Sequence, residues 1–262
     1  MSLQTNSSSK LNSGQKPVFQ VLCPKVKNVQ LMGAYTSFSD ILSWVRTQSK
    51  KNNTNYETAI LFSEIAISPG SRPERHINMI DIYAKLFSRT LLHMPEISVA
   101  FCVFENNNGV VSSTGYLITR EAILWRPKLA ITNYENDMLV RYALNINQNN
   151  VTAIIREMKD KTIVQSKNLI DENPDFRQTT TPSGRIVEYR ICADIFRQKS
   201  RTEPEILLVS AAGLNTSSQE LNRFKTVLVH DGLNGVSARG EAYHLISIQE
   251  ESTFWVATLL DE

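Results

Sequence analysis

Short apolar runs and amphipathic stretches alternate along the chain from about residue 29 onward. A short apolar run between turn residues predicts a buried strand, and apolar residues three or four positions apart predict a helix. Within the first hundred residues, the expected elements are strands at Val29–Met32 and Thr58–Phe62, one helix beginning near Ser39, and a second beginning near Pro73.

The middle and the end of the chain are richer in strands. Ile97–Phe104 and Val111–Ile118 flank the polar turn Asn106–Gly109, which is typical of a β-hairpin. The segment 137–161 is ambiguous, and the apolar spacing at its end favours a helix. Further strands are expected at 121–128, 186–195, 205–209, 226–229, 242–248 and 254–259. Strands that alternate with helices, together with hairpins, predict an α/β fold with mixed sheets whose faces are covered by helices.

The composition fits a single globular unit. A chain of 262 residues with 42% hydrophobic residues supplies enough apolar surface for a substantial core. Residues 1–16 are polar and rich in serine and asparagine, so they are expected to be a disordered leader or the remnant of an expression tag. Residues 17–262 are expected to form one domain.

Charge and cysteine content bear on partners and location. A formal net charge of +2 gives no basic face for nucleic acid or an anionic membrane, so neither partner is expected. Three cysteines without a CxxC pair do not make a disulfide framework, which favours a reducing compartment. We therefore expect a cytoplasmic protein, with secretion by a route that needs no signal peptide left open. The four histidines, His76, His93, His230 and His244, are dispersed without ligand spacing, so no metal site is expected.

Three residues of different chemistry stand at the ends of predicted strands: Glu64, Lys128 and Cys192. The rim of an α/β sheet is where reacting groups gather, because the sheet fixes their backbones. A thiol with an ordinary pKa of about 8.5 is mostly protonated at neutral pH and needs a cation or a base to become nucleophilic. Each residue also has an ordinary interpretation, Cys192 as a small core residue and the other two as surface charges.

The order and context of these three residues resemble the carbon–nitrogen hydrolase family, also called the nitrilase superfamily. Leu61-Phe62-Ser63-Glu64 is similar to the family's strand that runs into a glutamate, with serine in place of the usual proline. Trp125-Arg126-Pro127-Lys128 is similar to the strand that ends in the family's lysine. A third segment runs from Gly184 through Ile191-Cys192-Ala193-Asp194 and resembles the family's Ile-Cys-x-Asp/Glu strand. The resemblance covers roughly residues 28 to 215.

The resemblance implies a four-layer α-β-β-α sandwich with mixed sheets, commonly assembled as a homodimer. It also implies hydrolysis of a small-molecule, non-peptide amide through a thioester on Cys192, without a cofactor. Glu64 would serve as general base and acid, and Lys128 and the N–H of Ala193 would stabilise the oxyanion. Glu135 is the candidate for a second glutamate that holds Lys128 or orients the substrate. Nitrile-hydrolysing members place Trp-Glu after the cysteine, whereas this chain has Ala-Asp, which favours an amide.

Two departures from the family pattern keep other functions open. The stretch after Ser210–Asn215 is short and polar where the family has a long helix, and Pro127 fixes the backbone immediately before Lys128. One alternative is a non-catalytic binding or interaction protein that kept the fold. Another is an acyltransferase that uses the same thioester with an amine acceptor.

Overall fold

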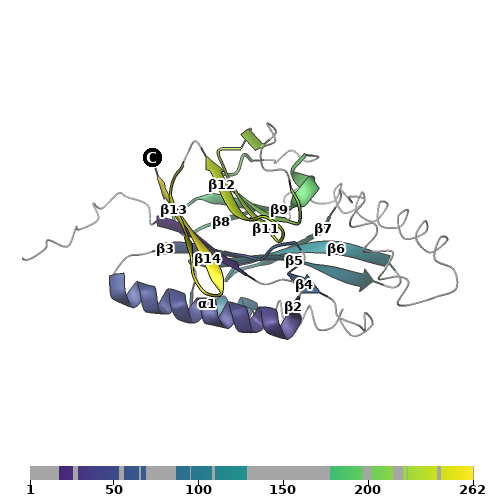
Figure 1. Cartoon of the computed structure of the whole chain (residues 1–262), viewed down its shortest axis with the longest axis horizontal. Helices are drawn as coiled ribbons and strands as arrows, with labels where there is room; N and C mark the ends of the chain where they lie inside the picture. The colour runs from purple at the N-terminus through teal and green to yellow at the C-terminus, as the bar shows by residue number, and fades with distance from the viewer. Residues whose placement is uncertain are drawn as a thin grey trace, which may run out of the picture.

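The computed structural model describes residues 18–25, 29–52, 56–64, 66–68, 87–94, 96–107, 110–128, 178–196, 202–214, 221–222, 224–240 and 243–261. These residues form two β-sheets packed face to face, and helix α1 (Leu31–Asn52) lies along the outer face of the larger sheet (Figure 1). Among the described residues, no helix is long and apolar enough to cross a membrane.

The larger sheet contains nine of the described strands. At its centre, β1 (Val18–Pro24), β3 (Tyr56–Leu61) and β5 (Ile97–Asn107) run parallel to one another. Hairpins extend it on both sides, so the sheet is mixed. The other strands are β2 (Val29–Gln30), β4 (Ile67–Ser68), β6 (Val110–Ile118), β7 (Ile123–Pro127), β13 (Tyr243–Glu250) and β14 (Phe254–Asp261).

The smaller sheet is mixed as well. Its three central strands, β9 (Ile186–Ile191), β10 (Ile206–Ala211) and β11 (Thr226–Asp231), are parallel. The edge strands β8 (Gln178–Thr180) and β12 (Gly235–Gly240) pair with them in the antiparallel direction. Both parallel cores have the near-continuous apolar sequences that burial on two faces requires.

Side chains of β3 alternate between two hydrophobic clusters. Ala59 and Leu61 face the smaller sheet and belong to the core between the sheets. Ile60 and Phe62 face the other way and pack in the cluster under α1. The helix contributes an apolar stripe at helical spacing, formed by Phe38, Ile41, Leu42 and Val45.

The two sheets are also fastened by a buried ion pair at the end where β3 begins. Arg185 Nη1 lies 2.7 Å from Glu57 Oε2, and both side chains are buried. Ser183 donates its backbone N–H to the same carboxylate at 2.7 Å. The turn between β8 and β9 that carries these donors needs Gly184, whose φ of 87° is strained for any residue with a Cβ.

Several expected boundaries need correction. The strand expected at Val29–Met32 is limited to Val29–Gln30, and the helix begins at Leu31, not near Ser39. A short apolar run does not distinguish a strand from the first turn of a helix, which explains the error. The strand expected at 186–195 ends at Ile191 and is followed by a 3₁₀ turn, Cys192–Phe196. Strands β1, β4, β8 and β12 were not expected.

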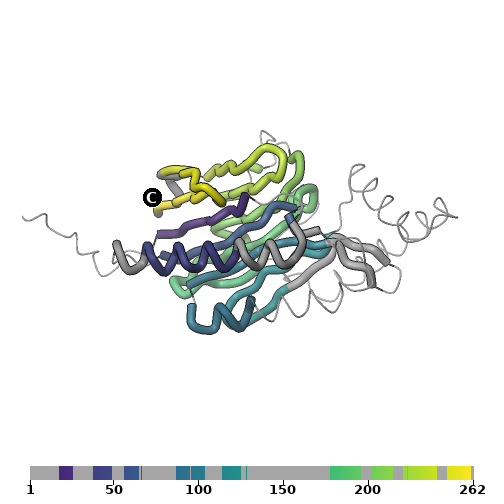
Figure 2. The backbone as a smooth tube through the Cα atoms, turned by 60° about the horizontal axis from the view of Figure 1, so that its bottom comes forward, coloured from purple at the N-terminus to yellow at the C-terminus, as the bar shows by residue number. Residues whose placement is uncertain are grey.

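Strand β1 is the most consequential omission, because it lies between β14 and β3 in the larger sheet (Figure 2). The hairpin expected around Asn106–Gly109 is confirmed by the antiparallel pairing of β5 and β6. Of the second helix, residues 87–91 are helical. Its earlier part, the leader and the segment 137–161 lie outside the described residues.

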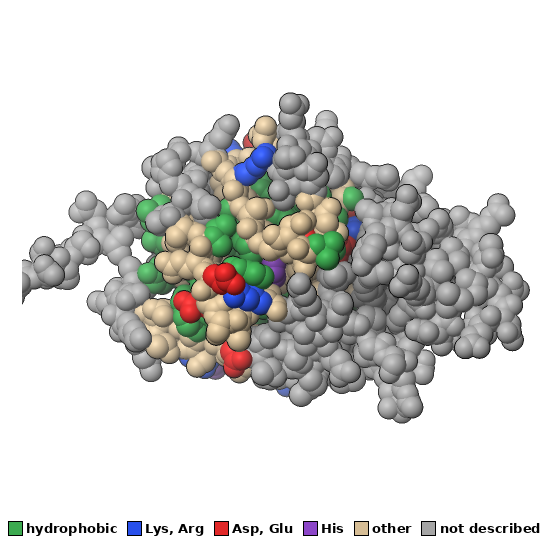
Figure 3. Space-filling model, viewed as in Figure 1, with side chains coloured by type: hydrophobic (Ala, Val, Ile, Leu, Met, Phe, Trp, Pro, Cys, Tyr) green, Lys and Arg blue, Asp and Glu red, His purple; other side chains and the backbone are tan. Residues whose placement is uncertain are grey.

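On the described part of the face shown in Figure 3, acidic and basic side chains are intermixed and separated by apolar and neutral groups. Among the ion pairs of the described residues, Lys25 Nζ lies 2.6 Å from Glu250 Oε1. An exposed pair of this kind contributes little stability.

Candidate active site

Two of the three strand-end residues form a buried ion pair. Glu64 lies three positions after the end of β3, and Lys128 directly follows β7. Their side chains are 2% and 1% exposed, and Lys128 Nζ donates a hydrogen bond to Glu64 Oε1. Sixty-four positions separate the two residues in the sequence, so the contact is made by the sheet. The structure therefore brings together the carboxylate and the amine that the sequence singled out.

Removing two opposite charges from water is costly, and their mutual attraction rarely recovers more than that cost. A buried ion pair is therefore weak evidence for stability. It is better evidence for a chemical role, because charged groups in water-poor surroundings are a common feature of active sites. The compact ammonium of Lys128 also carries further N–H donors besides the one that Glu64 accepts.

Cys192 occupies an unusual backbone conformation at the end of β9. Its φ is 42°, which makes it the one non-glycine residue with a positive φ among the described residues. A non-glycine residue is held in the left-handed region only where its surroundings enforce it, and such residues gather at active sites. The side chain is 6% exposed. The sharp turn ends the strand at Ile191 and starts the 3₁₀ turn that contains Ala193, whose side chain is half-buried.

Hydrogen bonds between the sheets bring the ends of β3, β9 and β10 to one edge of the sandwich. Ile191 is the register partner of Ser210, and Ser210 Oγ donates to the carbonyl of Phe62 at 2.5 Å. The N–H of Glu64 donates to the carbonyl of Ala211 at 3.3 Å. Cys192 therefore follows a strand whose end is joined, through β10, to the segment that carries Glu64. Glu135 lies outside the described residues.

The sequence did not single out the polar side chains that surround this edge. His230 on β11 is buried, and its Nδ1 lies 2.6 Å from the carbonyl of Leu61. Because a carbonyl only accepts, Nδ1 carries the proton. Burial lowers the pKa of His230 to about 4, although the bond to Leu61 and the charge of Asp231 act in the opposite direction. An isolated histidine at the end of an apolar strand gives no signal of this contact.

The three cysteines differ in their surroundings. Cys23 lies on β1 in the core between the sheets, and burial raises the pKa of its thiol. Cys102 on β5 donates a hydrogen bond from Sγ to the carbonyl of Glu64 at 2.8 Å. Cys192 begins a turn at the sheet edge. All three are free, buried thiols of the core cluster between the sheets, and Cys192 is the one of them with a positive φ. No group of three or more possible metal ligands occurs among the described residues.

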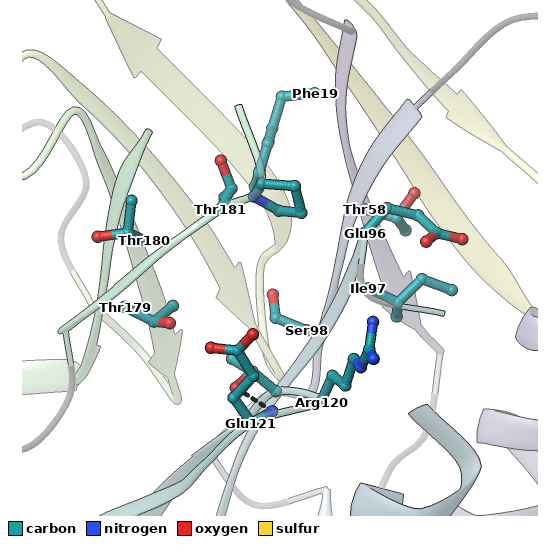
Figure 4. A pocket seen from close by; sticks show the side chains of 12 residues that line it. Phe19, Thr58, Glu96, Ile97, Ser98, Arg120, Glu121, Thr179, Thr180 and Thr181 are labelled. Atoms are coloured by element: carbon teal, nitrogen blue, oxygen red, sulfur yellow. Dashed lines mark hydrogen bonds between the residues drawn. The ribbon is translucent and has the colours of Figure 1, made fainter. Parts of the chain in front are cut away.

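A cavity of about 330 Å³ lies at the opposite end of the sandwich, where β3 and β5 begin (Figure 4). Its lining includes Ser98, Glu121 and the run Thr179–Thr181, whose oxygen atoms surround the open space. None of its described lining residues is a cysteine, lysine or histidine. The cavity thus has no thiol among its described lining residues and is separate from the edge that holds Glu64 and Lys128.

Comparisons with known proteins identify the fold. No family model matches the sequence. No curated protein matches it either. Among solved structures, the chain matches a glutamate-to-leucine variant of the amidase from Nesterenkonia sp. AN1, which carries the acetamide moiety of fluoroacetamide on its active-site cysteine. The TM-score is 0.55 and the sequence identity is 10%, over 97% of this chain and 94% of that chain.

Two further structures give the same result. A cysteine-to-serine variant of that amidase, from the nitrilase superfamily, matches with a TM-score of 0.54 and 11% identity, over 93% of this chain and 92% of that one. A carbon–nitrogen hydrolase superfamily protein from Xanthomonas campestris, with an arsenic adduct in its active site, has a TM-score of 0.50 and 9% identity, over 93% and 90% of the two chains. The chain therefore has the nitrilase fold, as expected from the sequence.

Proposed function

We propose that this protein is a cysteine-dependent hydrolase of a non-peptide amide, with Cys192 as nucleophile, Glu64 as general base and acid, and Lys128 as oxyanion stabiliser. The observation that supports this most is the buried contact between Glu64 and Lys128, at the sheet edge to which the strand of Cys192 leads. Hydrophobic side chains of similar size would stabilise the fold at these positions as well as the ion pair does. The presence of two buried charges therefore favours a catalytic role for Glu64 and Lys128.

In the first half of the reaction, Glu64 takes the proton from the Cys192 thiol, and the sulfur attacks the amide carbon. The electron pair of the carbonyl double bond moves onto oxygen. Lys128 and the N–H of Ala193 would stabilise that oxyanion, and a single such donor is worth about 3 kcal/mol in other enzymes. The carbon–nitrogen bond then breaks as Glu64 returns the proton to the departing amine, which leaves a thioester on Cys192.

In the second half, Glu64 takes a proton from water, and the resulting hydroxide attacks the thioester carbon. The carbon–sulfur bond breaks, the acid leaves, and the thiol regains the proton from Glu64. Every step moves a proton and no step changes an oxidation state, so two titratable groups and one cation are sufficient. Glu135 would hold Lys128 or orient the substrate. Ala193-Asp194 in place of Trp-Glu favours an amide over a nitrile.

Alkylation by fluoroacetamide, followed by mass mapping of peptides, tests the nucleophile. Cys192 is expected to be labelled well before Cys23 and Cys102, because in this proposal Lys128 favours the Cys192 thiolate, whereas burial raises the pKa of the Cys23 thiol. A matched Cys192→Ala variant is expected to lose the early label. Equal labelling of the three cysteines, or early labelling of Cys102, would contradict the assignment of Cys192.

Turnover tests the base. In Glu64→Gln, labelling of Cys192 is expected to slow, because glutamine cannot take the proton of the thiol, and ammonia release from a panel of small amides is expected to disappear. Glu121→Gln, an exposed glutamate at the other end of the sandwich, is the control. Formation of a new amide with an added amine, in place of the free acid, would favour the acyltransferase, and absence of both products would favour a binding protein.

A further inference from the structure

The four residues Leu61–Glu64, which we name the base segment, continue the chain from the end of β3 to the proposed base. Strand β3 ends at Leu61, so Phe62, Ser63 and Glu64 follow the strand itself. The carbonyl groups of the base segment are nevertheless all hydrogen-bonded. Ser63 accepts from the backbone N–H of Ala66 at 3.2 Å. The other three accept from side chains.

These three side-chain donors come from three strands. His230 on β11 donates from Nδ1 to Leu61 at 2.6 Å. Ser210 on β10 donates from Oγ to Phe62 at 2.5 Å. Cys102 on β5 donates from Sγ to Glu64 at 2.8 Å. All three donors are buried, and two of them reach across from the smaller sheet.

A fourth side chain connects the strand of the proposed nucleophile to the same segment. The hydroxyl of Tyr189 on β9 lies 2.9 Å from Ser210 Oγ. Because the single proton of Ser210 goes to Phe62, Tyr189 is the donor in this bond. Tyr189 stands three positions before Cys192. A continuous chain of hydrogen bonds therefore runs from β9 through Ser210 to the base segment.

We infer that Cys102, Ser210 and His230 are positioning residues, which hold the base segment so that the Glu64 carboxylate stays within reach of Cys192 and of the attacking water. This inference rests on the function proposed above. Catalytic groups need to be held within about 0.5 Å of the productive geometry, and misplacement by about 1 Å costs up to about a hundredfold in rate. Backbone bonds to Ala100 and Ala211 hold the N–H groups of Phe62 and Glu64, and the buried side-chain donors hold the carbonyl groups.

The test uses 4-nitrophenyl acetate with the full-length protein. The amplitude of the nitrophenolate burst reports how many Cys192 thiols become acylated, and the steady-state rate reports hydrolysis of the thioester, which needs Glu64. The variants that remove a donor are Cys102→Ala, Ser210→Ala and His230→Leu. Cys102→Ser and His230→Gln keep a donor in place. Thr226→Val is the matched control, because the Thr226 hydroxyl is buried on β11 without a partner among the described residues.

The donor-removing variants are expected to lose about tenfold or more in steady-state rate, with a burst amplitude close to that of the wild type. The donor-keeping variants and Thr226→Val are expected to match the wild type in both. If Ser210→Ala and Cys102→Ala keep the wild-type steady-state rate while Glu64→Gln is slow, the positioning role is wrong and the proposed base is unaffected. The positioning role would also be overturned if the donor-keeping variants were as slow as the donor-removing ones while their thermal unfolding stayed unchanged. Altered packing, and not the lost hydrogen bond, would then explain the slower rate. A wild-type steady-state rate in Glu64→Gln itself would overturn the proposed base, and the positioning role with it.

Discussion

Replacement of Lys128 by methionine is expected to lower both the labelling of Cys192 and the hydrolysis of amides by about a hundredfold or more, and the free energy of unfolding by about 3–5 kcal/mol. The two losses have separate causes. In the proposed mechanism, loss of the ammonium removes the cation that would favour the thiolate and stabilise the oxyanion. It also leaves Glu64, which is 2% exposed, as a buried carboxylate without its cation.

The double variant Glu64→Leu, Lys128→Met separates the two causes. Well-packed apolar residues often replace a buried ion pair without loss of stability, so the double variant is expected to regain most of the stability that Lys128→Met loses. Its hydrolytic activity is expected to stay absent. Urea unfolding of the three proteins measures the first quantity, and ammonia release measures the second.

A double variant that remains as unstable as Lys128→Met would show that the neighbours of the pair cannot accommodate apolar side chains, and that the charges are needed for folding. A double variant that is stable and active would remove Glu64 and Lys128 from the mechanism. Thr226→Val serves again as the control for a buried polar side chain whose removal breaks no hydrogen bond among the described residues.

The fold follows from the sequence wherever burial on both faces produces an apolar run. Strands β3, β10 and β11 are of this kind, and every described position after the first residue of β3 is buried. Strand β12 was missed because its residues are half-buried or exposed, and its sequence, GVSARG, has no apolar run. Strand β1 directly follows a polar leader and ends in a proline, which conceals a run that is otherwise buried.

The candidate site is less accessible to sequence reasoning than the fold. Glu64 and Lys128 were paired by their resemblance to motifs that occur in a fixed order, since residues so far apart have no local spacing to read. The contact itself depends on how β7 joins the sheet through β6. The donors to the base segment are even harder to predict from the sequence, because Ser210 and His230 belong to the other sheet. Only tertiary packing places them next to Leu61 and Phe62.

Acidification is expected to destabilise the native protein by up to about 3 kcal/mol between pH 6.5 and 4, through His230. Burial lowers the pKa of this side chain from 6.5 to about 4 in the folded protein. Between these values the unfolded chain binds a proton that the folded protein does not, so stability falls as the pH falls, by about 1.4 kcal/mol per pH unit. The contribution is fully present above pH 6.5 and is lost by pH 4.

Comparison with His230→Gln isolates this contribution, because glutamine keeps an N–H donor for Leu61 and does not titrate in this range. Urea unfolding at several pH values is expected to show a difference between the two proteins that shrinks from pH 7 to pH 4. Asp231 titrates at lower pH. Burial alone would raise the pKa of its carboxyl, but hydrogen bonds from the N–H groups of Gly213, Leu233 and Leu214 lower that pKa below 3.8. The contribution of Asp231 to the free energy of unfolding is therefore lost only below that pH. Parallel curves for the two proteins down to pH 4 would mean that His230 accepts a proton in the folded state, and that its contact with Leu61 survives as a charged hydrogen bond.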